Sequence, residues 1–542
     1  MKKNIIWAPS MVAGLLWLLT ACQAGNSTNS PVGVSNLFSF DAVDITALQD
    51  AIRVQCADSV SKANAPLYGV YAQRNFKPIW LNKEGVCACA QAWLNQLKQI
   101  RYEGIDSTIG QATVLDSLLH LAKQENQLDN TAFTTAFELS FSRSYLATAQ
   151  RLVLGSTDSV GIPKKYWHAV NDTLNAEQLF ALVNFNDSVS NFQALIPQHP
   201  WYRVMRQEYR RIDSLMASYT IPKTSDWFQT DSLGVKVATP ALYALFDMRL
   251  QGIPDSLKKT DTATFKRLVA RFQWQYGLKT NGRLDSITEA LLQWPFEEQK
   301  KSIALNMERM RRFNYRFAQP FVWVNIPQMN LFVYRNDSPV FYMRSVVGRA
   351  SRPTPVIDAD MKHVVISPPW TVPPTILQKD VLPGMLRSGG AYLARKGLKA
   401  VDASGKPIDP SIINASNYKR YSYTQKPGYN SSLGEVKFNM PNSESVYMHD
   451  TPHREDFPRS NRALSSGCVR VHKPKEFAEF VLNDTVKYSY ANIDSMCKQR
   501  KTKYIPINQP MRVYFAYFTI GLDSTGRITY PADIYGWDPY RP

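Results

Sequence analysis

A cysteine with the surroundings of a nucleophile lies in the stretch ALSSGCVRV, residues 463–471. Thiol catalysis needs a reachable sulfur, a base, and hydrogen-bond donors for the oxyanion that develops on the attacked carbonyl. Gly467 has no Cβ, so the chain can turn sharply and aim the amides of Gly467 and Cys468 at that oxygen. Arg470 would share a strand face with Cys468, where its charge could favour the thiolate or its hydrogen bonds could hold the turn. We predict that Cys468 is the nucleophile.

The base must come from one of seven histidines. His449 ends the β-like segment ESVYMHD and alternates with Tyr447, so both side chains should leave the sheet on one face. It precedes Cys468 by 19 positions, which leaves room for a loop and a return on the neighbouring strand. We predict that His449 is the general base.

Two other uses of these residues are less favoured. Pro452 interrupts the segment HDTPH, so no helix is expected to present its two histidines to one metal ion. A disulfide from Cys468 would have Cys497 as its one obvious partner. The sequence therefore predicts no metal and no cofactor, although zinc-compatible ligand types are supplied by His449, His453, Cys468 and His472.

Strands must position these reactive side chains. Residues that favour β-strands begin after Pro320 and are arranged with a period of two. Segments such as FVWVNI, NLFVYRND and HVVISPPW predict a β-rich domain over residues 318–542. The interval 384–435 is rich in Gly, Ser, Asn, Tyr and Lys, and is predicted to be an inserted flap.

Helical patterns dominate the chain before that domain. Residues 38–239 carry apolar residues three and four apart, as in FELSFSRSYLATAQRLVLG, which stops at Gly155, and they contain no catalytic constellation. Residues 240–297 form a helix–turn–helix pattern that resembles the peptidoglycan-binding module of cell-wall enzymes; the alternative is a helical spacer. One linker helix is predicted within residues 298–317. The fold class is therefore multidomain α+β, with a helical scaffold domain before a β-rich domain.

The N-terminus has the pattern of an export signal. Two lysines precede an apolar run from Met11 to Leu19 that is too short for a comfortable membrane span. The run ends in LTAC, which resembles the lipobox of bacterial lipoproteins. The resemblance implies a signal peptide at residues 1–21, lipidation of Cys22 and a flexible tether over 22–37. An ordinary secretory signal with an incidental Cys22 is the alternative.

Charge and cysteine content argue against two other classes of protein, nucleic-acid-binding proteins and disulfide scaffolds. The net charge is +18, but no Arg/Lys block interleaves with aromatic residues, so no nucleic-acid partner is predicted. Six cysteines are too few for a disulfide scaffold. Cys56, Cys87 and Cys89 lie close together in a chain expected to be exported, and they predict one bridge from Cys56 to Cys87 or Cys89.

The segment YMHDTPHREDFPRSNRALSSGCVRV resembles the active-site region of the L,D-transpeptidases with a YkuD-type domain. The segments PPWTVPPTI, QKPGYNSSLGEVKF and ADIYGWD fit the large periplasmic subgroup, which carries a scaffold domain, a peptidoglycan-binding module and a capping insertion. The resemblance implies a β-sandwich-like catalytic domain. It also implies an oxyanion hole from the amides of Ser466, Gly467 and Cys468. The position of Ser466 is a histidine in many relatives, so a side-chain role there is in doubt.

The same resemblance implies a donor pocket and a reaction. Tyr447, Trp370 and Arg470 would shape the pocket. Cys468 would attack the third-residue carbonyl of a peptidoglycan tetrapeptide stem, release D-Ala and pass the acyl group to an amine of another stem, giving a 3→3 cross-link. The cellular location implied is the periplasm, on a lipid anchor, and Gln23 favours the outer membrane.

Three other functions stay open. A papain-like wall peptidase or amidase would have its cysteine before its histidine, the reverse of the order in this chain. A sortase-like enzyme has the right order but a longer spacing to its arginine. The third is a wall-binding lipoprotein without catalysis.

Overall fold

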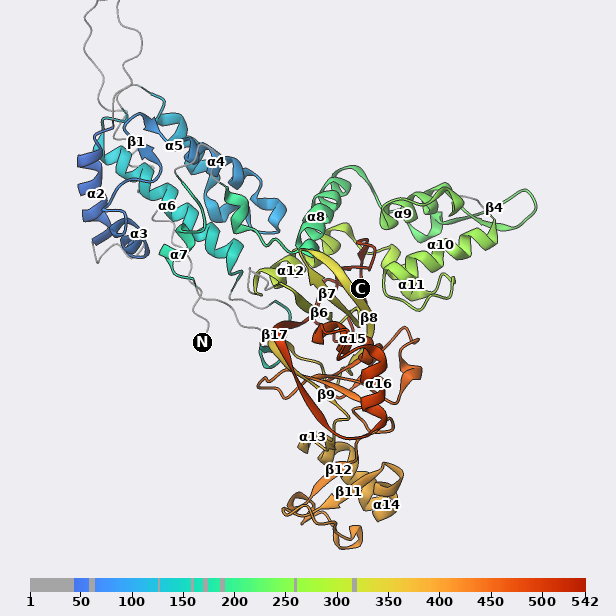
Figure 1. The fold of residues 1–542 in the computed structure, drawn as a ribbon. Coiled ribbons are helices and arrows are strands. Elements are labelled where there is room, and N and C mark those ends of the chain that lie inside the picture. Colours follow the sequence, from blue (N-terminus) through green and yellow to red (C-terminus); the bar gives the residue numbers. More distant parts are fainter. Residues whose placement is uncertain are drawn as a thin grey trace, which may run out of the picture.

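The computed structural model describes residues 43–57, 64–124, 127–156, 160–168, 174–185, 191–257, 261–313 and 319–542. The predicted signal peptide, Cys22 and the tether lie outside these residues. The described chain consists of a helical lobe, a smaller lobe of three helices and a hairpin, a large sheet, and a cap at the far end of that sheet (Figure 1). This confirms the predicted multidomain α+β class. No helix of the described part is long and apolar enough to cross a membrane.

A long buried helix forms the centre of the helical lobe. α6 (Thr131–Val153) begins at Asn130, whose side chain accepts hydrogen bonds from the amides of Ala132 and Phe133 and so caps the helix. It ends before Gly155, which adopts a φ of +72° as a helix-terminating glycine does. Around it lie α2 (Ile45–Ala57), α3 (Tyr68–Ala72), α4 (Ala88–Lys98), α5 (Ala112–Leu121) and α7 (Ala176–Phe180) (Figure 1).

The disulfide of this lobe differs from the prediction. Cys87 and Cys89, at the start of α4, are bonded to each other, with their Cα atoms 5.2 Å apart. Cys56 keeps a free thiol on the buried face of α2. Burial raises the pKa of this thiol to about 11; the charge of Arg143 lowers it and that of Glu138 raises it by smaller amounts. The predicted bridge to Cys56 is therefore wrong, because the two cysteines that could have paired with it are bonded to each other.

Two paired helices connect the helical lobe to the rest of the chain. α8 (Pro200–Ser218) packs along α12 (Phe296–Arg311), and Lys300 Nζ lies 2.5 Å from Asp213 Oδ1 between them. The buried guanidinium of Arg311 donates to the hydroxyl of Tyr202 on α8 (2.7 Å) and to the carbonyl of Glu103 in the helical lobe (2.9 Å). The single helix predicted within 298–317 is thus α12, and its charged side chains bind it to both neighbours.

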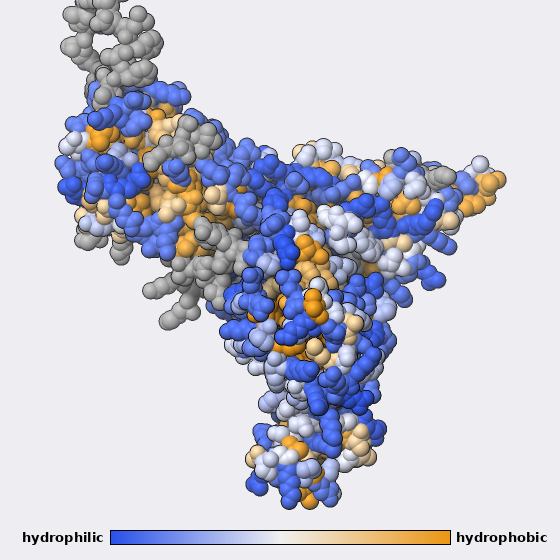
Figure 2. All heavy atoms as spheres, viewed as in Figure 1, coloured by the Kyte–Doolittle hydropathy of each residue, from blue (hydrophilic) through white to orange (hydrophobic). Residues whose placement is uncertain are grey.

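The smaller lobe contains the predicted helix–turn–helix. Its helices are α9 (Pro240–Leu250), α10 (Thr262–Gln275) and α11 (Ser286–Leu292), preceded by a hairpin of β4 (Phe228–Thr230) and β5 (Lys236–Ala238). The buried side chain of Gln273 accepts hydrogen bonds from the amides of Asn281 and Gly282, both 2.9 Å, which fixes the turn after α10. Leu233 and Val235 are exposed at the hairpin tip, the hydrophobic end of this lobe in Figure 2.

Eight strands of the C-terminal region form a sheet that closes on itself. β14 (Met448–His449) runs parallel to β16 (Val469–Val471), and β6 (Phe321–Asn325) runs parallel to β17 (Lys503–Ala516). The other neighbouring pairs of strands in the ring are antiparallel. The helix α15 (Pro474–Leu482) contributes Phe477 to the core, 4.7 Å from the ring of Phe438. The helix α16 (Tyr490–Lys498) follows it. The order around the ring is β13 (Val436–Asn439), β14 (Met448–His449), β16 (Val469–Val471), β8 (Ser338–Gly348), β7 (Asn330–Arg335), β6 (Phe321–Asn325), β17 (Lys503–Ala516) and β9 (Val356–Ile366), which pairs with β13 again.

A strand from the N-terminal half extends this sheet. β3 (Trp167–His168) pairs in parallel with β9, with Trp167 opposite Val356. At the end of this strand, His168 Nε2 lies 3.4 Å from Oε1 of Glu444, in the loop that leads to β14. The helical half is therefore joined to the sheet by backbone pairing as well as by side chains.

The cap is a small folded unit rather than a plain flap. It contains β10 (Trp370–Thr371), α13 (Pro374–Ile376), a π-helical turn (Leu377–Val381), α14 (Leu382–Arg395), β11 (Leu398–Val401) and β12 (Ser422–Gln425). Its three strands pair in the order β10–β12–β11. Ten buried side chains, Leu377, Leu393 and Tyr423 among them, form a core separate from that of the main sheet. The inserted unit thus begins at β10, ahead of the range 384–435 that composition predicted.

Candidate active site

Cys468 lies on a tight turn between two strands that both pair with β8. β15 (Ala463–Ser465) runs parallel to β8 and β16 antiparallel to it, so the chain reverses direction over residues 466–468. Gly467 adopts a φ of +118°, which residues with a Cβ rarely reach. The glycine before the cysteine is therefore required by the turn, and the side chain of Cys468 is left half-buried.

Hydrogen bonds inside the turn fix its shape. The hydroxyl of Ser465 donates to the carbonyl of Cys468 (2.6 Å) and accepts from the amide of Gly467 (3.2 Å). The hydroxyl of Thr354 donates to the carbonyl of Gly467 (2.8 Å) and accepts from the amide of Gly348 (2.8 Å). Two hydroxyl side chains thus hold both sides of the glycine.

These contacts change the expected set of oxyanion donors. The amide of Gly467 is engaged by Ser465, so it does not point freely toward substrate. The amides of Ser466 and Cys468 make no hydrogen bond within the part of the chain that the structure describes. Of the three amides predicted from sequence, these two are left to bind a developing negative charge.

His449 lies on the strand next to the cysteine turn. In the parallel pairing of β14 with β16, Met448 is opposite Val469 and His449 is opposite Arg470. Met448 and Val469 are fully buried in the core. Since side chains alternate along a strand and paired residues share a face, the opposite face carries Tyr447, His449, Cys468 and Arg470.

A backbone carbonyl orients the imidazole. His449 Nδ1 lies 2.5 Å from the carbonyl oxygen of Asp450. A carbonyl can only accept, so the proton is on Nδ1 and Nε2 keeps the lone pair that a base needs. The side chain of Asp450 is itself held by the amides of Thr451 (2.7 Å) and Glu435 (2.8 Å) and by the guanidinium of Arg454.

Burial sets the protonation of the cysteine and histidine. It raises the pKa of the Cys468 thiol to about 11, and the Tyr447 amide, Lys437 and Arg470 lower that pKa by less. Burial, followed by the charge of Arg470, lowers the pKa of His449 to about 3. At neutral pH the resting pair is therefore a neutral thiol beside a neutral imidazole. The charge of Arg470 favours the thiolate as predicted, but the effect of burial is larger.

Two cations flank this pair. Arg470 Nη1 donates a hydrogen bond to Asp456 Oδ2 (3.2 Å), so this guanidinium forms an ion pair with the preceding loop. Lys437 is paired with His449 in the β13–β14 register, and its ammonium lies 3.9 Å from the ring centroid of Tyr447. Burial lowers the pKa of Lys437. The sequence analysis missed this lysine, although its alternation with the buried Val436 and Phe438 would have placed it on the site face.

The cap reaches the site through a tryptophan. The side chain of Trp370 on β10 lies close enough to the hydroxyl of Tyr447 to lower the pKa of that group. The ring of Tyr447 lies 5.7 Å from that of His449, and burial is the largest cause of its raised pKa. The structure thus brings the two aromatic residues predicted for the donor pocket together beside His449.

Two arginines that sequence reasoning missed bind the residue before Gly467. Ser466 Oγ accepts from Arg352 Nη1 (3.0 Å) and from Arg349 Nη2 (3.3 Å). The amide of Arg349 also donates to the carbonyl of Ser465 (3.0 Å). Both arginines follow β8 in the chain, and only the folded sheet brings them to the turn.

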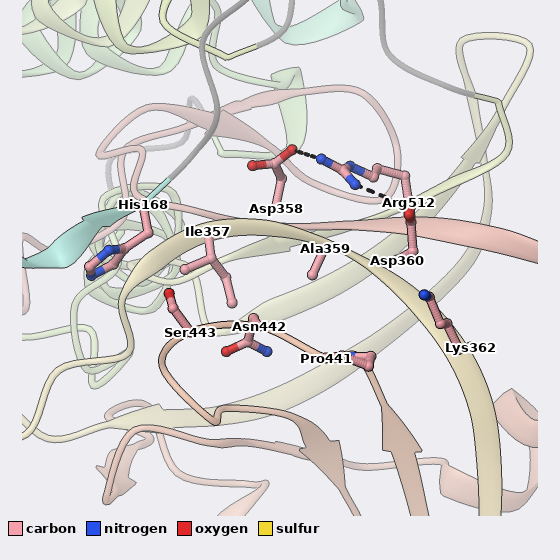
Figure 3. Close-up of a pocket in the computed structure, with 10 residues that line it drawn as sticks. All are labelled: His168, Ile357, Asp358, Ala359, Asp360, Lys362, Pro441, Asn442, Ser443 and Arg512. Carbon is pink, nitrogen blue, oxygen red and sulfur yellow. Dashed lines mark hydrogen bonds and ion pairs between the residues drawn. The ribbon is translucent and has the colours of Figure 1, made fainter.

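A hollow of about 350 Å³ lies beside β9 (Figure 3). Its two aspartates are paired, because Arg512 binds both Asp358 and Asp360. The loop 441–443 forms another wall, and the same loop leads into the strand that carries His449. The ion pairs of Arg512 therefore join β17 to β9 beside this hollow.

Two of the histidines considered as zinc ligands contact other side chains. His453 Nδ1 lies 3.1 Å from Glu455 Oε1, and the ring of His472 packs 4.8 Å from that of Phe457. Among the described residues, no three His, Cys, Asp or Glu side chains form a group that could hold a metal ion.

Comparison with protein-family models identifies two regions. Residues 319–488 match the model of the L,D-transpeptidase catalytic domain, and this range includes the cysteine turn and His449. Residues 65–208 match the Scaffold domain, which covers most of the helical lobe.

Individual proteins that are similar to this chain include one curated sequence and one solved structure. A curated protein of Haemophilus influenzae, named provisionally as an L,D-transpeptidase, is 36% identical over 242 residues, 44% of this chain and 48% of its own length. The match thus spans about half of that relative. A solved structure of the Ldtfm–avibactam carbamoyl enzyme covers 49% of this chain and 90% of its own, at 11% identity and a TM-score of 0.17, which is too low to compare the folds in detail.

Proposed function

We propose that this chain, which carries an L,D-transpeptidase catalytic domain at residues 319–488 and a Scaffold domain at residues 65–208, is a peptidoglycan L,D-transpeptidase. The observation that supports this most is the cysteine turn itself. A half-buried thiol, two unengaged amides and a histidine with its Nε2 lone pair lie on one sheet face, inside the matched domain.

The first half of the reaction uses the neutral pair. As Cys468 Sγ attacks the carbonyl carbon of the third stem residue, its proton passes to His449 Nε2. The amides of Ser466 and Cys468 donate to the oxyanion that forms. When the tetrahedral intermediate collapses, the amide nitrogen of the departing D-Ala takes that proton, and a thioester to Cys468 remains.

The second half reverses these proton transfers. An amine of a second stem attacks the thioester carbonyl and gives its proton to His449. The carbon–sulfur bond breaks, Cys468 leaves as thiolate and is reprotonated by the imidazolium, and a 3→3 amide joins the two stems. Because His449 is neutral at rest, it can accept a proton in each half of the cycle.

The walls of the donor pocket are Tyr447, Trp370, Lys437 and Arg470. Two aromatic side chains supply apolar contact area, and two cations suit a stem that carries carboxylates. The apposition of Trp370 and Tyr447, from the cap and from β14, supports a pocket that forms between the cap and the sheet.

The rest of the chain would bring this site to the wall. The lipobox-like LTAC supports lipidation of Cys22 and a periplasmic location, and Gln23 favours the outer membrane. The lobe of α9, α10 and α11 would act as a peptidoglycan-binding module. Donor and acceptor stems, with the membrane as anchor, are the partners of this proposal; no nucleic acid and no cofactor is needed.

The proposal is tested by replacing the nucleophile. Cys468→Ala should abolish formation of 3→3 cross-linked dimers from purified disaccharide tetrapeptides, measured by mass spectrometry. Cys497→Ala is the matched control, because that free thiol is buried elsewhere and should leave the product yield unchanged. Undiminished dimer formation by the Cys468→Ala protein would contradict the proposal.

A further inference from the structure

The side chain of Arg352 touches both the cap and the cysteine turn. Its Nη2 lies 2.8 Å from Asp380 Oδ1 in the π-helical turn of the cap, and its Nη1 also pairs with that carboxylate. The same Nη1 lies 3.0 Å from Ser466 Oγ, one residue before Gly467. One planar guanidinium thus binds two units of the protein at once.

We propose that Arg352 is a positioning residue that couples the closed position of the cap to the geometry of the turn carrying Cys468. This rests on the function proposed above, which gives the turn its role. Arg352 acts through Ser466, whose amide is one of the two donors left for the oxyanion. When Asp380 fixes the guanidinium, the guanidinium fixes the side chain of Ser466 and with it the direction of that amide.

The construction of the cap supports movement as a unit. Its apolar core is separate from that of the main sheet, so the cap can shift without exposing the sheet's core. Trp370, whose side chain lowers the pKa of the Tyr447 hydroxyl, gives a second contact between cap and site. Two such side-chain contacts are easier to break and reform than a shared hydrophobic core.

The exposure of the ion pair suits a reversible contact. The side chain of Arg352 is 13% exposed and that of Asp380 is 38% exposed, so water and salt reach the carboxylate. Partly exposed ion pairs are weak and are screened by salt. The hydrogen bond from the Tyr392 hydroxyl to the Asp380 carbonyl (3.1 Å) ties the carboxylate-bearing turn to α14, so release of Asp380 would involve that helix. Closure of the cap over a bound peptide stem would then assemble the oxyanion donors.

The test compares three variants of the full chain. Asp380→Asn removes the charge, Asp380→Glu keeps it, and Arg352→Lys can keep only one of the two contacts. Asp409→Asn is the control, because Asp409 caps a short helical turn elsewhere in the cap and Asn caps equally well. The readouts are hydrogen exchange of residues 370–425, the rate of Cys468 alkylation by iodoacetamide, and the kinetics of dimer formation.

We expect Asp380→Asn to speed both exchange of the cap and alkylation of Cys468 by roughly fivefold or more, as local opening becomes more frequent. The kcat should fall about tenfold with KM within about twofold, because oxyanion donors act in the transition state. Arg352→Lys should show the same changes as Asp380→Asn. In Asp380→Glu and Asp409→Asn, all three readouts should stay near their wild-type values.

If Asp380→Asn shows the same cap exchange, the same alkylation rate and the same kcat as the wild-type protein, the proposed coupling is wrong. A fall in kcat that Asp380→Glu does not rescue would also overturn it, since the ion pair would then not be the cause. If the wild-type protein forms no cross-linked dimer, the proposed function fails, but exchange and alkylation still decide whether cap and turn are coupled.

Discussion

The protonation of Cys468 and His449 distinguishes two kinds of thiol catalysis. A preformed thiolate–imidazolium pair reacts with alkylating agents well below neutral pH, whereas a neutral pair needs a base to remove the proton. Burial raises the pKa of Cys468 to about 11 and lowers that of His449 to about 3, so the structure corresponds to the neutral pair.

The rate of Cys468 alkylation should therefore rise with pH, by roughly tenfold per unit, through pH 9 without a plateau. Stopped-flow alkylation between pH 5 and 10 measures this, with Cys468→Ala as the blank for other thiols. A plateau below pH 7 would mean that the thiolate is already formed at rest.

Replacing His449 should affect cross-link formation much more than it affects the reactivity of the Cys468 thiol. His449→Gln should lower dimer formation by about 10²- to 10⁴-fold, as expected for loss of a general base. Alkylation at pH 9 should change much less, because the reagent needs only the thiolate. Equal losses in both measurements would indicate that the substitution disturbs the turn instead.

Residue types and spacing were enough to select side chains that the fold brings together. The proposed nucleophile Cys468, its glycine Gly467 and the proposed base His449 lie within two short segments, and strand alternation places Cys468 and His449 on one face. The partners missed by sequence are those that depend on distant pairing: Lys437 from β13, Arg352 from the loop after β8 and Asp380 from the cap. The engaged amide of Gly467 could not be foreseen either, because Ser465 and Gly467 are brought into contact by a conformation of the turn.

At the scale of the element, the turn depends on the backbone of Gly467. A Cβ at this position would meet nothing closer than the carbonyl of Pro353, at 3.6 Å, so a methyl group fits and only the φ of +118° resists it. We expect Gly467→Ala to lower the free energy of unfolding by about 1–3 kcal/mol and dimer formation by about 100-fold, because the amides of the turn lose their direction.

Gly526 provides the control for this prediction. It has a φ of +82° in the turn between β18 (Gly521–Leu522) and β19 (Ile528–Thr529), and a Cβ added there would meet nothing within 4 Å. Gly526→Ala should cost similar stability in urea unfolding while activity stays within about twofold. If both alanine variants keep full activity, the turn does not need the glycine conformation.

Elements with strong local signals were the most predictable. α6 follows from its helical period and its end at Gly155. The site strands β14 and β16 span two and three residues, and only their pairing in the ring defines them. Composition suggested a flap at 384–435 because Gly, Ser and Asn are frequent there, yet scattered apolar residues gather into a core once β10, β11 and β12 pair.

The whole molecule is held together by buried contacts between its halves. β3 adds to the edge of the sheet, α12 binds α8 and the helical lobe, and His199 at the start of α8 packs against the sheet. The ring of His199 lies 4.8 Å from that of Trp323 and 5.4 Å from that of Tyr334. Such long-range contacts have no signature in local sequence, which explains why the domain arrangement was less predictable than the domains.

His199 makes this junction sensitive to acid. Burial, followed by the charge of Arg203, lowers its pKa from 6.5 to about 3. Below pH 6.5 the unfolded chain binds a proton that the folded chain does not, so the stability contributed by the neutral ring falls as the pH falls toward 3. Between pH 6.5 and pH 4 this amounts to about 3 kcal/mol of unfolding free energy.

His199→Asn tests this acid sensitivity without removing the helix cap. The His199 side chain accepts a hydrogen bond from the amide of Trp201, and an Asn side chain can do the same. At pH 7 the variant should be less stable than wild type by about 1–3 kcal/mol, since the smaller side chain leaves a cavity. At pH 4 that difference should vanish or reverse, because Asn does not titrate. Urea unfolding followed by tryptophan fluorescence at both pH values measures the difference, and the same gap at pH 7 and pH 4 would mean that His199 does not control the acid response of the junction.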